Sequence, residues 1–450
     1  MASMMRVRKG AWPGARCRVV TPALLAVLAT AAVAAPPPRP ITLAEALAMA
    51  ERNDVSVVLA DGGARNADAS VRTAYGAFLP NLSVSAGTSR QLGGTGGTRV
   101  ENGQVIVLSR QLWSTNVGAS ANLVLFDGGQ RLFDLSQAKA SRVSADVSAA
   151  TARWQAALAT KQAFYNVLAA RETQLAAAAQ LEQALQQRVD AVARTRVKTA
   201  TRSDSLRAEI QVRNARLAVT QASTDLGSAN SALGRTVGSL QPVTAASSDS
   251  SLATSLSLDD STLAMLVEDA PSVRASRAEL DAAREARKSA WTAYLPSLSA
   301  GWSRSGNGTG DSPAWDATTL DYSGSLRFNV TFPLFDQFGR EARMTQTAVA
   351  VRNAEAQLLD ARLAARQALS DGLGGFRDAT ERMASESASV EAADEDLRVQ
   401  RERYRLGGST LLDVLGSQAQ LDQARHDLIR ARFDQRVAKA QLEALIGRDL

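Results

Sequence analysis

Apolar and polar residues alternate one by one in four stretches of this chain. The stretches cover residues 81–91, 113–126, 296 to about 304, and 322–334. Alternation with a period of two is typical of a strand with one apolar and one polar face. The clearest stretch sets Tyr322, Leu326, Phe328, Val330 and Phe332 against polar neighbours. The pattern predicts four strands arranged as two hairpins, about 81–126 and 296–334.

A helical pattern follows each hairpin. Residues 128–194 and 337–404 form runs of 67 and 68 residues without proline, long enough to span roughly 100 Å at 1.5 Å per residue. Three glycines, at 372, 374 and 375, are expected to weaken or kink the second run. Heptads mark the two returning helices, with seams at Ala208, Val212, Ala215, Val219, Ala222, Leu226, Ala229 and Leu233, and at Leu421, Ala424, Leu428, Ala431, Gln435, Ala438, Leu442 and Leu445.

Shorter elements are expected between these long ones. Thr42 and Glu45 suit an N-cap and a capping-box partner for a helix that continues to about Phe78, with a break near Asn53. Further along, the sequence suggests a polar loop opening at the glycines of 93–97, a linker or side element at 242–260, a short helix at 263–267 and another helix from Pro271 to Tyr294.

The chain contains an internal repeat. Adding 209 to the positions of residues 194–238 aligns them without a gap on residues 403–447, and both hairpins end in Leu-Phe-Asp, at 125–127 and 334–336. The starts of the hairpins align at an offset of 216 instead, which places a seven-residue length difference in the hairpin loops. One supersecondary unit is therefore used twice.

The N-terminal segment is read as a secretory signal peptide. Five basic residues precede an apolar run at 19–33, and Ala32-Val33-Ala34 suits cleavage after about Ala34. Cleavage would remove Cys17, the only cysteine, so the mature chain would have neither disulfides nor a thiolate site. Removing those five residues from the 51 basic ones leaves 46 against 45 acidic residues, a net charge near +1 that does not indicate nucleic-acid binding.

These features predict four segments. They are a signal peptide at 1–34, a first repeat at 35–240 with its helical tip at about 195–204, a linker at 241–270, and a second repeat at 271–450 with its tip at about 405–411. Two-faced strands suit a membrane barrel, which cannot close with four strands. Protomers would have to share one barrel of eight or twelve strands, in an obligate oligomer. Taken singly, each hairpin could instead cap a soluble helical domain.

The residues resemble one family, the TolC-like outer membrane efflux proteins. The resemblance rests on both Leu-Pro-x-Leu-Ser strand starts, both Leu-Phe-Asp ends, and the segments 404–407 and 412–415. It implies a mixed α and β fold: a trimer with a twelve-stranded outer-membrane β-barrel, four strands per protomer, above a long periplasmic α-barrel. It also implies a passive exit channel of a tripartite efflux pump or type I secretion system, whose partners are a periplasmic adaptor and an inner-membrane transporter of RND, ABC or MFS type.

The resemblance also implies site residues at the two tips. Asp204, Tyr404 and Asp413 match positions of a periplasmic gate, and the turn residues proposed to contact the adaptor are Arg202, Leu406, Gly407 and Gly408. The chain departs from the family pattern at Ser409 and Gly416, and its first turn, 198–201, lacks the usual glycine. A plain helix-capping role is the alternative for both aspartates.

Other functions find less support in the sequence. His426 is the only histidine and lies on a charged helix, and no phosphate loop, metal cluster or nucleophile constellation stands out. The sequence therefore predicts no enzyme, cofactor or metal site. The remaining alternative is a secreted periplasmic coiled-coil scaffold or adhesin without a pore.

Overall fold

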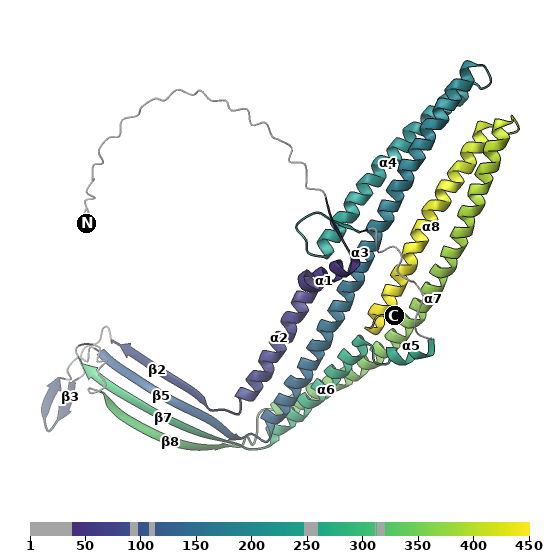
Figure 1. The fold of residues 1–450 in the computed structure, drawn as a ribbon. Coiled ribbons are helices and arrows are strands. Elements are labelled where there is room, and N and C mark those ends of the chain that lie inside the picture. Colours follow the sequence, from purple (N-terminus) through teal and green to yellow (C-terminus); the bar gives the residue numbers. More distant parts are fainter. Residues whose placement is uncertain (1–37, 91–97, 108–112, 247–259, 311, 313–319) are drawn as a thin grey trace, which may run out of the picture. The chain divides into compact units, whose positions relative to one another are not determined.

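The computed structural model describes residues 38–90, 98–107, 113–246, 260–310, 312 and 320–450 (Figure 1). Residues Pro38–Leu450 form one compact unit. Three predictions lie outside the described residues: the signal peptide at 1–34, the glycines of 93–97, and the part of the expected linker at 247–259.

Two consecutive helices open the described chain. They are α1 (Leu43–Asn53) and α2 (Val55–Gly76). The predicted break falls at Asp54, whose side chain accepts a hydrogen bond from the Ser56 backbone N–H at 2.8 Å and so caps α2. Thr42 caps α1 as expected by accepting from the Glu45 N–H at 3.2 Å, and the Glu45 carboxylate binds Arg39 at 2.5 Å.

Two helical hairpins account for most of the helical residues. The first joins α3 (Gln130–Arg196) to α4 (Arg202–Thr236), and the second joins α7 (Gly339–Arg405) to α8 (Leu411–Ile446). Each long helix has 67 residues, and every predicted seam position on α4 and α8 is at least partly buried. Helix α3 packs against α2, α4, α6 and α8, which makes it common to both repeats.

Helix α7 runs without interruption through its three glycines. A Cβ placed on Gly372 would lie only 2.7 Å from Leu442 Cδ2 of α8. The glycine therefore allows α7 and α8 to approach closely, and the continuity of the helix shows that α7 tolerates its low intrinsic helix propensity. In the part of the chain that the structure describes, no helix is long and apolar enough to cross a membrane.

The predicted strands form one antiparallel sheet in the order β2-β5-β7-β8 (Figure 1). Their bounds are Asn81–Ser89, Trp113–Phe126, Ser297–Gly310 and Asp321–Thr331. Each repeat supplies one pair, and the β5–β7 pairing joins the repeats. Two expected ends were wrong: β7 continues past Arg304 to Gly310, and β8 stops at Thr331 before reaching Leu334.

Four short strands were not predicted. Within the expected polar loop, β3 (Thr98–Glu101) pairs with β4 (Gln104–Val107) across Asn102 and Gly103, whose φ angles are 53° and 78°. The other pair is parallel and joins β1 (Arg39–Ile41) to β6 (Val243–Ala245). Strand β6 is buried, so of the two alternatives for 242–260 its first residues fit the side element and not the linker.

Three helical segments precede β7 and β8, the sheet strands of the second repeat. The short helix α5 (Asp260–Val267) and the helix α6 (Pro271–Trp291) agree with the sequence expectation, and a single 3-10 turn, η2 (Thr292–Tyr294), follows α6. Residues of α5 and α6 share an apolar core with α7 and α8, which includes Leu263, Leu280, Leu369 and Leu442.

Candidate functional site

The strand register places small polar side chains in rows across the sheet. One row crosses all four strands through Ser83, Ser120, Ser303 and Ser325. Within it, the Ser83 and Ser120 hydroxyls lie 2.7 Å apart and the Ser303 and Ser325 hydroxyls lie 3.0 Å apart. Because side chains alternate between the faces of a strand, these serines share one face.

Neighbouring rows on the same face have the same character. Ser305 and Ser323 pair at 3.2 Å, and Asn116 donates to the Asn307 side-chain oxygen at 2.6 Å. The charged residues at this face's positions are Asp321 and Arg327, both on β8. The polar face therefore consists mainly of short, uncharged hydrogen-bonding groups.

The opposite face of the sheet is apolar and exposed. In this single chain the exposed fractions are 73% for Leu82, 64% for Leu326, 67% for Phe328 and 69% for Val330. An exposed apolar surface of this kind marks contact with lipid or with another protein. Strands β2 and β8 form the edges of the sheet, so each has a neighbour on one side only, and open edges are templates for pairing with another chain.

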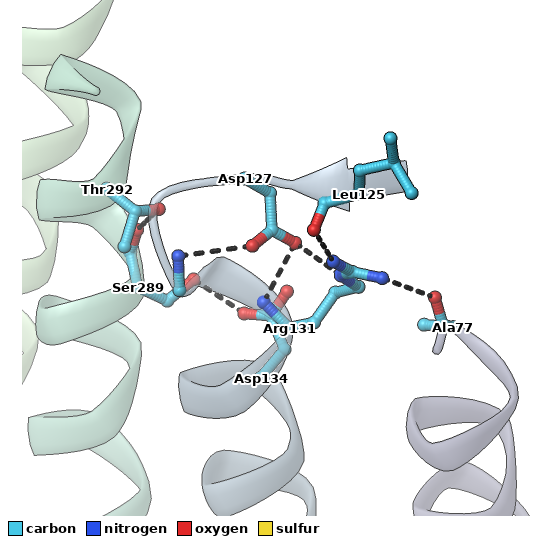
Figure 2. Close-up of polar contacts among 8 residues, drawn as sticks. Ala77, Leu125, Asp127, Arg131, Asp134, Ser289 and Thr292 are labelled. Atoms are coloured by element: carbon cyan, nitrogen blue, oxygen red, sulfur yellow. Dashed lines mark hydrogen bonds and ion pairs between the residues drawn. The ribbon is translucent and has the colours of Figure 1, made fainter. Parts of the chain in front are cut away.

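An ion pair fixes the elbow where β5 turns into α3 (Figure 2). The Asp127 carboxylate accepts from the Gly129 backbone N–H at 3.1 Å and from Arg131 Nε at 2.7 Å. Arg131 also donates to the carbonyl oxygens of Ala77 at 3.3 Å and Leu125 at 3.5 Å. The two side chains are only 15% and 17% exposed. The guanidinium therefore ties the end of α2 and the end of β5 to the start of α3.

A second contact fixes the same elbow to the other repeat. The Ser289 hydroxyl of α6 donates to Asp134 of α3 at 2.5 Å, as Figure 2 shows. The turn itself passes through Gly128 at φ 68°, where an added Cβ would lie 2.8 Å from the Leu295 Cβ. Glycine is needed here because it accepts a positive φ and lacks the atom that would collide.

The second elbow, from β8 to α7, repeats the arrangement. Asp336 accepts from the Arg340 backbone N–H at 2.9 Å and lies 3.4 Å from Arg340 Nε. Arg340 also donates to the Leu334 carbonyl at 3.2 Å. Gln337 and Phe338 hold the positive φ angles here, at 59° and 64°. The offset of 209 therefore relates Asp336 and Arg340 to Asp127 and Arg131 in structure as well as in sequence.

At the tip of each helical hairpin, the same type of capping box begins the returning helix. Thr201 caps α4, and Asp204 accepts from the Thr201 backbone N–H at 3.0 Å and from its hydroxyl at 2.8 Å. Thr410 caps α8, and both of its bonds to Asp413 are 2.8 Å. The structure thus places both predicted gate aspartates in helix caps, as the alternative interpretation expected.

The caps lower the pKa of both aspartates. The Thr201 side-chain hydrogen bond is the largest cause for Asp204, and the Thr410 backbone N–H is the largest cause for Asp413. A lowered carboxyl pKa stabilises the folded tip above the ordinary value of 3.8, and this contribution is lost as the pH falls through the lowered value. Both tips are therefore fully capped at neutral pH.

Tyr404, the third predicted gate residue, contacts the other hairpin of the same chain. The Arg194 guanidinium lies 4.7 Å from the centre of its ring. The residues proposed for adaptor contact, Arg202, Leu406, Gly407 and Gly408, are all exposed, with Leu406 at 86%. The gate and contact roles of these seven residues remain predictions.

A network of hydrogen-bonded polar side chains connects the two hairpins at a short distance along the helices from their tips. Arg401 donates to Gln418 at 2.7 Å, Gln418 donates to Asp422 at 3.0 Å, and Gln180 of α3 donates to Asp422 at 2.7 Å. Burial is the main cause of a raised pKa at Asp422. The sequence did not predict this network, because its residues lie outside the heptad seams, whose members are apolar except for Gln435. The available signal was the spacing of Gln418, Asp422 and Arg425, four and three residues apart, which places three polar residues on one side of α8.

The sequence profile of the outer membrane efflux protein family matches residues 46–239 and 263–448. The chain belongs to the outer membrane efflux protein family. The two matched segments correspond to the two repeats, and the mixed α and β fold predicted from the sequence is confirmed. Family membership assigns the chain to the outer-membrane channels of efflux and secretion systems, which are transport proteins and not known enzymes. It also favours a channel over a scaffold or adhesin.

Individual relatives agree with this assignment. The chain is 27% identical to Protein CyaE of Bordetella pertussis over 390 residues, covering 84% of this chain and 78% of the relative. It is 26% identical to the outer membrane efflux protein BepC of Brucella suis over 415 residues, covering 90% and 85%. A solved structure of CusC has the same fold, with a TM-score of 0.76 at 16% identity, over 90% of this chain and 92% of that one.

Proposed function

We propose that this protein is a passive trimeric exit channel in the outer membrane, serving a tripartite efflux pump or a type I secretion system. The observation that carries the proposal is the four-stranded sheet with one polar face, one apolar face and two open edges. A barrel encloses its polar face as a lumen and presents its apolar face to lipid.

The strand directions are compatible with closure by copies of the same chain. The sheet is antiparallel throughout and has four strands, so its edge strands β2 and β8 run in opposite directions. The β8 edge of one protomer can therefore pair antiparallel with the β2 edge of the next. Three protomers would close a barrel of twelve strands, and membrane barrels need at least about eight.

The helical hairpins would continue this channel into the periplasm as an α-barrel. Its gate would lie at the tips, with Asp204 and Tyr404 in the closing contacts and three copies of Asp413 around the mouth. A ring of carboxylates attracts cations and disfavours anions. The exposed residues Arg202, Leu406, Gly407 and Gly408 would contact a periplasmic adaptor, which links the channel to an inner-membrane transporter of RND, ABC or MFS type.

Single cysteines on the two faces of the sheet test the lumen assignment. Cys17, the only native cysteine, lies in the expected signal peptide, so the mature chain would have no thiol of its own. Ser303→Cys and Leu326→Cys would then introduce a single thiol on the polar face and on the apolar face respectively. A charged methanethiosulfonate reagent should change the conductance of Ser303→Cys trimers in a planar bilayer and leave Leu326→Cys unchanged. The reverse pattern, or a soluble product whose gel migration does not depend on heating, would contradict the channel.

The same recordings test the gate. Asp204→Ala removes the carboxylate from the first tip, and Tyr404→Phe removes a hydroxyl while keeping the ring beside Arg194. Each should raise conductance, because a few tip hydrogen bonds of about 0.5 to 1.5 kcal/mol would hold the closed state. Unchanged conductance in both variants would argue against the gate.

A further inference from the structure

A cavity of about 200 Å³ lies between the two helical hairpins near their tips. Its polar walls come from Asp190 and Arg194 of α3 and from Arg401, Tyr404 and Arg405 of α7. Ala191, Leu411 and Val414 provide an apolar lining, and all three are buried. The cavity therefore combines charged walls with a small apolar surface.

The charges of the lining are unbalanced. Three guanidinium groups and one carboxylate face the cavity, which leaves a formal charge of +2. The surrounding tips have the same sign: residues 190–209 and the equivalent residues 399–418 together contain eight basic and five acidic side chains. A positively charged pair of tips attracts a partner surface that carries carboxylates.

Two of these arginines are held by groups without a negative charge. Arg194 stacks on the Tyr404 ring at 4.7 Å, and Arg401 donates to the Gln418 side-chain oxygen at 2.7 Å. A guanidinium has five N–H donors, so neither contact uses its full hydrogen-bonding capacity. Arg405 differs, because its partner is Glu402 at 3.2 Å. Arg194 of α3 and Arg401 of α7 therefore keep positive charge available in the cavity lining.

We propose that this cavity receives a carboxylate side chain of the periplasmic adaptor, which bridges Arg194 and Arg401. The inference rests on the proposed function and adds the chemistry of the partner. A glutamate or aspartate fits the lining because its carboxylate meets the guanidiniums while its methylene groups cover Leu411 and Val414. Arginine is suited to this role because its planar fork binds a carboxylate through two hydrogen bonds. The bound side chain would join the two hairpins of one protomer.

Two labelled helical peptides provide the probe. Both are alanine-rich, acetylated and amidated, and they differ only in one central residue, glutamate or glutamine. Fluorescence anisotropy against detergent-solubilised trimers should show the glutamate peptide binding about tenfold more tightly, the factor typical of one charge-assisted hydrogen bond. The difference should disappear in the variant Arg194→Gln/Arg401→Gln and persist in Arg196→Gln, an exposed arginine outside the cavity lining.

Charge reversal keeps the test valid if the double variant is poorly assembled. Arg401→Glu should bind a third peptide with lysine at the central position more tightly than the glutamate peptide. Equal binding of the first two peptides to the native trimer would overturn the proposal. Displacement of the glutamate peptide by inorganic phosphate at similar concentrations would also overturn it, because the site would then bind small anions. Normal bilayer conductance in those cases would leave the proposed channel function intact.

Discussion

The first elbow turns through Gly128 and Gly129, at φ 68° and 90°, whereas the second turns through Gln337 and Phe338 at 59° and 64°. At the tips the distribution is reversed: Lys198 has φ 59° in the first turn, and its equivalent in the second turn is Gly407 at 78°. Each repeat thus builds one turn with glycine and one with side-chain-bearing residues in the left-handed region.

Glycine is not required at every one of these turns, because surrounding contacts maintain the left-handed conformation where a residue with a side chain occupies it. An aspartate and an arginine clamp both elbows, and a threonine and an aspartate cap the helix after both tips. A residue other than glycine costs about 1 to 3 kcal/mol in the left-handed region, and it persists only where neighbouring structure imposes that conformation. The two copies of the repeat therefore share backbone geometry more strictly than residue type.

The largest expected effect is at Gly128. Gly128→Ala places a Cβ 2.8 Å from the Leu295 Cβ and forces alanine to adopt a positive φ. We therefore expect the free energy of unfolding to fall by about 2 to 4 kcal/mol. Gln337→Ala is the matched control at the second elbow and should be nearly neutral, since Gln337 is exposed. Thermal unfolding of both purified variants provides the measurement. Similar midpoints for the two would show that the elbows do not differ in packing.

A smaller difference is expected between the two clamps. Asp127→Asn should cost about 2 kcal/mol, because charge-assisted bonds contribute about 1.5 to 3 kcal/mol and this pair is mostly buried. Asp336→Asn should cost less. Asp336 is 29% exposed, and Arg340 Nε is buried without a hydrogen-bond partner among the described residues. Chemical unfolding midpoints compare the two, and a larger loss at Asp336 would contradict the ranking.

The smallest effect concerns the tips. Lys198→Gly relieves a positive φ at an exposed turn, and we expect a local gain of up to about 1 kcal/mol after the added freedom of the unfolded chain is included. Gly407→Ala should have the opposite sign. Hydrogen exchange measured by mass spectrometry on peptides covering 197–204 and 406–413 reports each tip separately. Faster exchange in Lys198→Gly would indicate that Lys198 makes a stabilising contact.

Long periodic segments were readily predicted from the sequence. Heptads over 26 and 25 residues identified α4 and α8, and alternation identified β2, β5, β7 and β8. The offset of 209 located both tips and the Leu-Phe-Asp segments that begin both elbows. These features are local or repeated, so each is supported by many residues.

Short and long-range features were missed for physical reasons. Strands β1 and β6 have three residues each, too few for a periodic pattern. The β3–β4 ribbon did carry a signal, because Asn-Gly favours two consecutive positive φ angles in a hairpin turn. The stacking of Arg194 on Tyr404 joins residues 210 positions apart, and only the packing of the two hairpins brings them together.

The parallel pair of β1 and β6 has a consequence for the order of folding. It joins Arg39–Ile41, near the start of the first repeat, to Val243–Ala245, just after its end. Both strands belong to a buried cluster with Phe164 of α3. Both strands and α3 precede the second repeat in the chain. During N-to-C-terminal synthesis and export, the first repeat can therefore close on itself and present a preformed helix α3, on which α6 and α8 of the second repeat assemble.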